Sequence, residues 1–135
     1  MPKGGGGGGI ESYGATVLRI FLGVIYIMHA YLAAFVYGPH GMTVFQRAQG
    51  LPFPEIGTWY VILAHGLGGI CLILGVLVRG AALVNIPIMA GALFAVHVKQ
   101  GFFMGKDGGY EYVLLVLAVT LALVFLGPGA LALRR

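Results

Sequence analysis

Four long apolar runs, nearly free of charged residues, occupy most of this 135-residue chain. They cover residues 13–37, 57–78, 80–98 and 110–126. The hydrocarbon core of a bilayer is about 30 Å thick, and a helix needs about 20 apolar residues to cross it. In lipid every backbone N–H and C=O must be paired within the chain, and a helix pairs them locally. The sequence therefore predicts an all-α integral membrane protein, an antiparallel four-helix bundle with short loops.

The composition agrees with a membrane location. Apolar residues make up 59% of the chain and charged residues 9%, whereas a soluble domain carries about 25% charged residues. The formal charge is +4, and the only basic run is Arg134-Arg135, so nucleic-acid binding is not expected. Cys71 is the single cysteine, which excludes an intrachain disulfide and a cysteine-rich metal site.

The segment before the first run has a different composition. Gly4–Gly9 is an unbroken glycine run, which has low helix propensity and high conformational entropy. We therefore expect a flexible leader over residues 1–12 and one transmembrane domain over residues 13–135. The first run is longer than the 7–15 apolar residues of a signal peptide, so we interpret it as a spanning helix.

Helix-breaking residues mark the connections between the runs. Residues 38–56 contain several prolines and glycines, and a short amphipathic turn at the membrane interface is predicted for residues 42–49. The second and third helices are predicted to join almost directly at Arg79-Gly80, which forces an antiparallel hairpin. Gly127-Pro128-Gly129 is a strong stop signal for the last helix.

The distribution of basic residues predicts the orientation. With four spans, both chain ends and the turn at Arg79 share one side of the membrane. The basic residues on or near that side are Lys3, Arg19, Arg79, Arg134 and Arg135, against Arg47, Lys99 and Lys106 on the other. The positive-inside rule then places both termini in the cytoplasm.

A further set of residues is assigned to interface or structural roles. Arg19, one to two turns inside the first helix, is expected to snorkel its guanidinium to the interface. Small residues recur along one stripe of the second helix and let helix backbones approach closely. Pro87 predicts a local kink, because it removes a backbone donor. The complete set is Arg19, Arg79, Gly68, Gly69, Gly75 and Pro87.

Four titratable residues lie in the half of the bundle away from the chain ends. They are His29, His65, His97 and Glu111, one on each run. His29 and His65 are both about eight residues from the same surface, or about 12 Å deep. Polar groups in membranes usually face the bundle interior or a cavity, which makes these four a candidate quinone site. In the alternative interpretation, each histidine only satisfies a neighbouring carbonyl or hydroxyl.

The sequence leaves the cofactor open. Haem held by His29 and His65 needs two histidines facing each other at equal depth. These two meet the depth condition, but nothing else in the sequence supports haem. Tyrosine and tryptophan residues nearby fit a quinone pocket, and equally an aromatic belt at the lipid interface. No metal site is predicted, because a local motif such as HExxH is missing.

Taken together, these elements resemble the DoxX family of small four-helix membrane proteins over about residues 15–129. The order and spacing of short segments carry the resemblance. These segments are Leu18-Arg19 with Gly23 and His29, Leu67–Gly69 through Leu74-Gly75 to Arg79, Met89-Ala90 through His97 with Gly101-Phe102, Gly108–Glu111, and Leu126–Gly129.

The resemblance implies a role in membrane redox chemistry. Members related to the DoxD/DoxA thiosulfate:quinone oxidoreductase are linked to quinone reduction, and others are proposed to assist membrane redox enzymes. Arg19, His29, His97 and Glu111 match positions that recur in the family. The chain departs from the family at His65, where helix two often carries an acidic residue. It also lacks the lysine that typically follows the helix-one histidine.

Three functional hypotheses follow, and whether the chain is an enzyme stays undecided. The first is a DoxX-like integral membrane protein, associated with redox chemistry, that binds a quinone near the outer leaflet. The second is a non-catalytic accessory or scaffold subunit of a larger membrane complex. A small-solute transporter ranks last, because four spans are few. Expected partners are membrane lipid and either other proteins or further copies of the chain, in a bacterial or archaeal plasma (inner) membrane.

Overall fold

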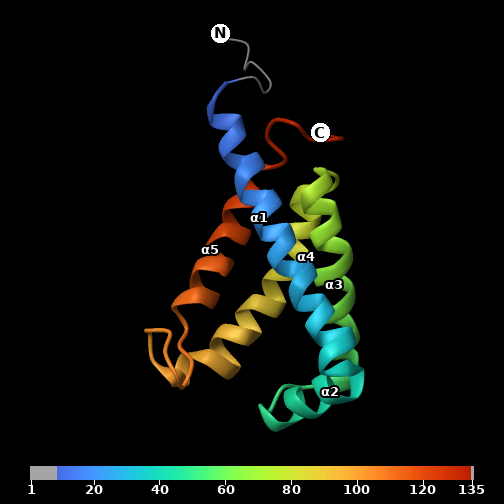
Figure 1. Ribbon diagram of the computed structural model, residues 1–135, viewed down its shortest axis with the longest axis vertical. Coiled ribbons are helices and arrows are strands. Elements are labelled where there is room, and N and C mark those ends of the chain that lie inside the picture. The colour runs from blue at the N-terminus through green and yellow to red at the C-terminus, as the bar shows by residue number, and fades with distance from the viewer. Residues whose placement is uncertain (1–8, 135) are drawn as a thin grey trace.

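The computed structural model describes residues 9–134, and within that range the protein contains helices and no strands (Figure 1). Three α-helices are continuous: α2 (Gly38–Ala48), α3 (Pro54–Leu74) and α5 (Glu111–Leu126). Two others run on into π-helical turns. The first is α1 (Glu11–Tyr31) with η1 (Leu32–Val36). The second is α4 (Val78–Gly91) with η2 (Ala92–His97), followed by the short 3-10 turn η3 (Val98–Gln100).

Three of the helices are long and apolar enough to cross a membrane. They are Glu11–Val36, Pro54–Leu74 and Val78–Gln100, with 26, 21 and 23 residues. The fourth predicted run forms α5, which is apolar but has only 16 residues. At 1.5 Å per residue it is about 24 Å long, shorter than the hydrocarbon core of about 30 Å. The all-α prediction is thus confirmed, with three helices of spanning length.

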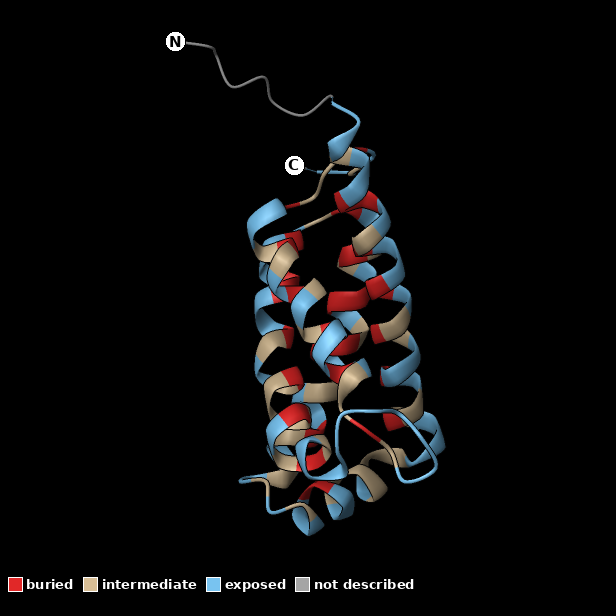
Figure 2. Cartoon of the chain, turned by 90° about the vertical axis from the view of Figure 1, so that its left-hand side faces the viewer, coloured by how far each residue is buried: buried red, intermediate tan, exposed pale blue. Residues whose placement is uncertain are grey.

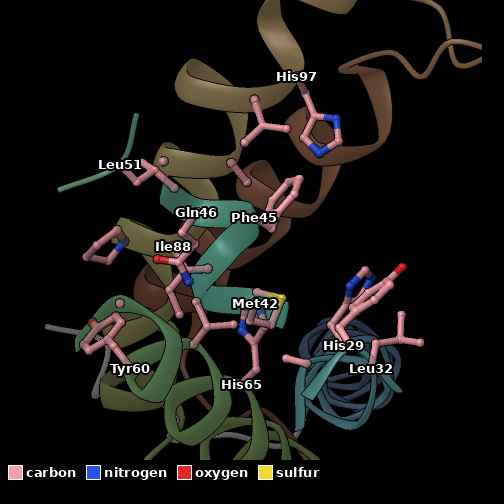
Figure 3. Close-up of a pocket in the computed structure, with 18 of the residues that line it drawn as sticks. His29, Leu32, Met42, Phe45, Gln46, Leu51, Tyr60, His65, Ile88 and His97 are labelled. Atoms are coloured by element: carbon pink, nitrogen blue, oxygen red, sulfur yellow. The ribbon is translucent and has the colours of Figure 1, made fainter. Parts of the chain in front are cut away.

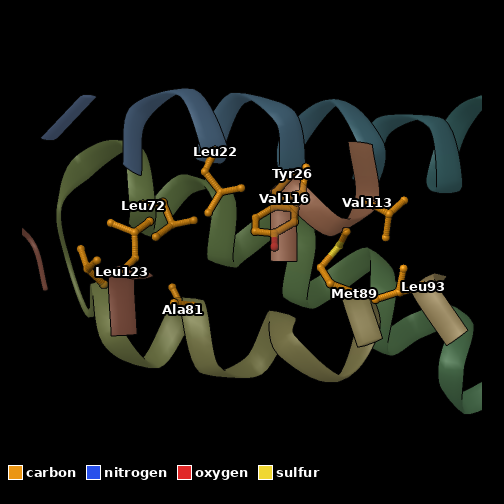
Figure 4. Close-up of a cluster of buried hydrophobic side chains, with 11 residues drawn as sticks. Leu22, Tyr26, Leu72, Ala81, Met89, Leu93, Val113, Val116 and Leu123 are labelled. Atoms are coloured by element: carbon orange, nitrogen blue, oxygen red, sulfur yellow. The ribbon is translucent and has the colours of Figure 1, made fainter. Parts of the chain in front are cut away.

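The helices α1, α3, α4 and α5 pack around one apolar core. The contacts run from α1 to α3, from α3 to α4, from α4 to α5 and from α5 back to α1, so the four helices form a closed bundle. Figure 4 shows side chains from these helices converging between them. The buried cluster consists of Leu22, Tyr26, Leu72, Val78, Ala81, Ala82, Met89, Leu93, Val113, Val116 and Leu123.

Apolar side chains also cover the outside of the bundle. Figure 2 shows buried residues on the inward faces of the helices and exposed residues on the outward faces. Phe21, Phe94 and Phe125 are 69%, 70% and 80% exposed. So much exposed apolar surface is unusual for a monomer in water, but it suits side chains that face lipid. The surface therefore agrees with an integral membrane protein.

The turn between α3 and α4 lies earlier in the chain than predicted. α3 ends at Leu74, and Gly75 adopts a left-handed conformation (φ 74°) while its N–H donates to the carbonyl of Cys71 at 2.9 Å. Glycine is favoured at this position because it has no Cβ to clash. Arg79 and Gly80 belong to the first turn of α4, so the predicted joint at these two residues was wrong.

The connection after the first span is more helical than predicted. α2 starts at Gly38 and has 11 residues, because Pro39 lies in its first turn, where a missing N–H costs nothing. The Thr43 hydroxyl donates to the carbonyl of Pro39 and accepts from the Thr58 hydroxyl, both at 2.8 Å. Arg47 of α2 also pairs with Glu55 of α3. These contacts hold α2 against the beginning of α3.

The two ends of the described chain lie at the same end of the bundle (Figure 1). The backbone N–H of Ala130 donates to the carbonyl of Ser12 at 3.0 Å. Of the leader predicted for residues 1–12, residues 1–8 lie outside the described residues. Glu11 and Ser12 already form the first turn of α1, so the helix begins two residues before the predicted start.

Arg19 is fully buried, with 0% of its surface exposed, so the prediction that it snorkels to the interface was wrong. Its guanidinium donates to five backbone carbonyls: Leu72 and Ile73 at 2.9 and 2.6 Å, and Pro128, Ala130 and Leu131 at 2.8, 3.2 and 2.9 Å. The first two belong to the last turn of α3, where carbonyls lack helical partners and carry partial negative charge. Arg19 thus joins the end of α3 to the C-terminal segment.

Candidate functional site

A cavity of about 520 Å³ lies between α1–η1, α2, α3 and α4–η2, at the end of the bundle away from the chain ends. Its volume falls within the range of about 300–1,000 Å³ that is usual for ligand sites. Most of the lining is apolar, as Figure 3 shows. The lining residues with polar side-chain groups are His29, Tyr37, Gln46, Tyr60, His65 and His97.

Both π-helical segments border the cavity. η1 contributes Leu32 and Ala33, and η2 contributes Ala92, Val96 and His97. A π-helical turn shifts the register of the side chains that follow it, and such turns are frequent at functional sites. The sequence pattern does not distinguish a π turn from an α turn, so these two segments were not predicted.

Pro87 also lines the cavity, and α4 continues through it. Proline leaves the carbonyl of Leu83 without its helical donor. One residue further, the carbonyl of Val84 accepts a hydrogen bond from the Tyr60 hydroxyl at 2.5 Å. This bond ties α3 to α4 beside the proline, and the predicted kink stays a prediction.

His65 is the most enclosed polar group of the cavity. It is 5% exposed, and its Nδ1 lies 2.6 Å from Oδ1 of Asn85. The Tyr26 ring stacks on the His65 ring with a centroid distance of 4.5 Å and an interplanar angle of 15°. The Tyr26 hydroxyl lies 2.5 Å from the Thr120 hydroxyl, which donates to the carbonyl of Val116 at 2.7 Å. α1, α3, α4 and α5 therefore all take part in holding the His65 ring.

His29, which the sequence places at about the same depth as His65, lies beside it. Their ring centroids are 6.4 Å apart, with the rings at 67° to each other. The Tyr112 ring also lies near His29, again with a centroid distance of 6.4 Å. His29 is exposed and makes no side-chain hydrogen bond within residues 9–134, so both of its ring nitrogens are open to a ligand.

His97 lines the same cavity at some distance from the other two histidines. Figure 3 shows it at one end of the cavity, with His65 and His29 toward the other end. Its Nδ1 lies 2.8 Å from Oε1 of Gln100, the side chain that also accepts the backbone N–H of Gly109 at 3.1 Å. His97 therefore connects the cavity wall to the loop before α5.

Glu111 is the predicted site residue that the structure places elsewhere. Its carboxylate accepts the backbone N–H of Met104 at 3.0 Å, and its own N–H donates to the carbonyl of Phe102 at 2.9 Å. The loop before α5 folds back over the start of that helix, and this turns the Glu111 side chain toward the loop. Glu111 does not line the cavity.

Asn85 was not among the predicted site residues. Asn85 is 0% exposed and bonds both to His65 and to two backbone carbonyls. A lone amide inside an apolar run was the available signal, but the spacing of residues in one helix does not show which neighbour such a side chain meets. Among the described residues, no three His, Cys, Asp or Glu side chains gather in a way that could hold a metal ion.

The cavity lies in the part of the chain that matches a family of known proteins. A family model described as DoxX matches residues 14–98, a stretch that contains every residue of the cavity lining. A protein of Haemophilus influenzae, described only as an uncharacterized protein, is 36% identical over 123 residues, which cover 90% of this chain and 88% of that protein. The search of solved structures found no match.

Proposed function

The chain belongs to the DoxX family, and from this premise we propose that it binds a quinone-class ligand in the cavity and takes part in membrane redox chemistry. The observation that carries the proposal is a mostly apolar cavity of about 520 Å³ that holds three histidines between membrane-crossing helices. A lipid-soluble ring with two oxygens needs both features: apolar walls for the ring and its tail, and nitrogens for the oxygens.

The position of the cavity supports the same proposal. It lies at the end of the bundle opposite the chain ends. If both termini are cytoplasmic, as the basic residues predict, the cavity belongs to the outer half of the membrane. Quinones are dissolved in the hydrocarbon of the bilayer, the phase that surrounds the spanning helices around the cavity.

A binding experiment with the purified protein tests the proposal. The protein is reconstituted in nanodiscs, and binding of a short-chain ubiquinone analogue, added oxidised and reduced in separate titrations, is measured by equilibrium partition. We expect saturable binding. We also expect His29→Ala and His65→Ala each to weaken binding of at least one of the two forms about tenfold, the loss of about one hydrogen bond.

His40→Ala is the matched control for these two variants. His40 is an exposed histidine of α2 that does not line the cavity, so its replacement leaves binding unchanged. If neither form of the analogue binds the folded wild-type protein, the proposal is wrong. Equal losses in all three variants would also count against it, because binding would then not depend on the cavity.

A different observation favours the accessory or scaffold role as a second candidate function. α5 is shorter than the hydrocarbon core, and one remedy for such a mismatch is association with other membrane helices. Beside α5, an apolar groove of about 240 Å³ runs along α1, lined by Val17, Phe21 and Leu115 among others. Extraction from the native membrane in mild detergent tests this role: partner subunits at fixed stoichiometry support it, and recovery as a monomer contradicts it.

A further inference from the structure

The Asn85 side chain has one orientation that satisfies its surroundings. Its amide nitrogen Nδ2 donates to the carbonyls of Ala64 and Ala81, at 3.0 and 2.8 Å. These two bonds use both of its N–H groups. If the amide were turned over, Oδ1 would face two carbonyl oxygens and both would lose a donor. The oxygen Oδ1 of Asn85 therefore faces His65.

This orientation decides which nitrogen of His65 carries the proton. Oδ1 of Asn85 lies 2.6 Å from Nδ1 of His65. An amide oxygen can only accept a hydrogen bond, so the donor must be the Nδ1–H of His65. In a neutral imidazole the other nitrogen, Nε2, is then unprotonated and can only accept.

The surroundings keep His65 neutral. The side chain is buried, and the chain has four acidic residues, Glu11, Glu55, Asp107 and Glu111. None of the four lines the cavity. A buried imidazolium without a carboxylate partner would leave an uncompensated charge out of water, which is costly. His65 therefore offers the cavity a lone pair at Nε2 and no proton.

The Nε2 atom is open to the cavity. Within residues 9–134, the one fully enclosed side-chain polar atom that lacks a hydrogen bond is Oε1 of Gln49. Nε2 of His65 makes no hydrogen bond in that part of the chain, so it is not enclosed, and His65 lines the cavity. The stacked Tyr26 ring fixes the plane of the imidazole.

The Tyr26 hydroxyl cannot donate a hydrogen bond to a ligand in the cavity. The single proton of the Thr120 hydroxyl goes to the carbonyl of Val116, so the bond between Thr120 and Tyr26 uses the Tyr26 proton. His29 makes no such bond and can donate or accept, so it does not distinguish between ligand oxygens. Of the three neighbouring side chains Tyr26, His29 and His65, His65 is therefore the one whose fixed accepting nitrogen distinguishes a ring hydroxyl from a carbonyl.

We infer that the cavity selects the reduced, hydroxyl-bearing form of a quinone-class ligand, with a ring hydroxyl donating to Nε2 of His65, and that Asn85 is the positioning residue for this selectivity. The inference rests on the proposed function and specifies the ligand form. A quinone carbonyl placed at the same point would bring two lone pairs together and gain no hydrogen bond. The difference of about one hydrogen bond corresponds to about tenfold tighter binding of the hydroquinone.

Three ligands of matched shape test this selectivity on the wild-type protein in nanodiscs under anaerobic conditions. They are a short-chain ubiquinone analogue, its hydroquinone, and the dimethyl ether of that hydroquinone. The ether keeps the aromatic ring but has no O–H donor. We expect the hydroquinone to bind about tenfold more tightly than the quinone, and the ether to bind no better than the quinone.

The tautomer is measured separately by nitrogen NMR on protein with ¹⁵N-labelled histidine, and His65→Gln identifies the resonance. We expect a protonated Nδ1 and an unprotonated Nε2. Asn85→Ala removes the acceptor for Nδ1–H and should bring the ratio of hydroquinone to quinone affinity close to one. If that variant fails to fold, the ligand series and the tautomer of the wild-type protein still decide the question.

The outcomes separate the inference from the proposed function. Preference for the hydroquinone over both other ligands, with the proton on Nδ1, supports the inference. Equal binding of hydroquinone and quinone, equal binding of hydroquinone and ether, or a proton on Nε2 overturns it and leaves the proposed function standing. Failure of both the quinone and the hydroquinone to bind overturns the proposed function and the inference with it.

Discussion

At the scale of single residues, charge burial is the main feature of this structure outside the cavity. Arg19 is a buried cation that pairs with no carboxylate among residues 9–134, and five backbone carbonyls take the place of a counter-ion. An arginine can serve five acceptors because its planar guanidinium has five N–H donors in a fixed arrangement. Arg79 has a similar role with fewer bonds, because it donates to the last carbonyls of α5.

We predict that Arg19→Met destabilises the protein strongly. The change removes five hydrogen bonds and leaves the carbonyls of Leu72, Ile73, Pro128 and Leu131 without a side-chain donor, whereas that of Ala130 keeps the Thr16 hydroxyl. Hydrogen bonds to a charged group contribute about 1.5–3 kcal/mol each without being additive. We expect a loss of at least about 3 kcal/mol, measured by denaturant unfolding of the protein in detergent. Arg19→Lys should recover part of the loss, because an ammonium has three donors.

Arg79→Met is the matched control for this prediction. Arg79 is exposed and donates to two carbonyls, at 3.0 and 3.4 Å, so its replacement should cost about 1 kcal/mol or less. Equal losses for the two arginines would show that burial of Arg19 does not matter to stability.

At the scale of elements, two glycines set the distance between α1 and α3. A Cβ on Gly69 would lie 2.8 Å from the carbonyl oxygen of Gly23, and a Cβ on Gly23 would lie 2.7 Å from that of Gly69. In lipid, such close backbone contact replaces the hydrophobic driving force between helices. On the neighbouring face of α3, a Cβ on Gly68 would lie 2.6 Å from Nδ2 of Asn85, so this glycine leaves room for the group that orients His65.

We predict that Gly69→Ala destabilises the bundle, because backbone atoms of α1 cannot move aside as a flexible side chain can. We expect a loss of about 1–3 kcal/mol, seen as a lower Tm by circular dichroism in detergent. Gly66→Ala serves as the control on the same helix. Its Cβ would meet Ala30 at 3.6 Å, an ordinary contact, so stability should be unchanged or slightly higher. A drop of the same size at Gly66 would contradict the argument.

At the scale of the whole molecule, the closed bundle gives the protein two unlike ends. One end carries the described chain termini, the α3–α4 turn and the Arg19 bonds. The other carries α2, the loop before α5 and the cavity. The structure shows that the two ends differ, and the basic residues predict which end faces the cytoplasm.

Labelling of single cysteines in intact cells tests the predicted orientation. In a Cys71→Ser background, Lys106→Cys marks the loop before α5, and Gly80→Cys marks the exposed first turn of α4. With both termini cytoplasmic, a membrane-impermeant maleimide should label Lys106→Cys in intact cells and Gly80→Cys only after lysis. The reverse pattern would place the cavity on the cytoplasmic side.

The sequence by itself determined the fold class, because long apolar runs have few stable structures other than helices in lipid. It also placed His29 and His65 at one depth, since position along a helix converts directly into distance. It predicted only a short turn over residues 42–49 and missed the beginning of α2 at Gly38, because a proline that usually breaks helices lies in the first turn of α2. Nor did it place Gly75 as the residue that ends α3.

Only the tertiary structure decided what each polar side chain meets, because a position along a helix gives depth but neither rotation nor neighbours. Arg19 donates hydrogen bonds to carbonyls of α3 and of the C-terminal segment, which lies far away in sequence. The Glu111 carboxylate accepts a hydrogen bond from Met104 in the loop before α5 and does not line the cavity. Asn85 reached His65 across the contact between α3 and α4. The position of the proton on His65, on which the inferred ligand choice rests, follows from that contact and from no feature of the sequence near either residue.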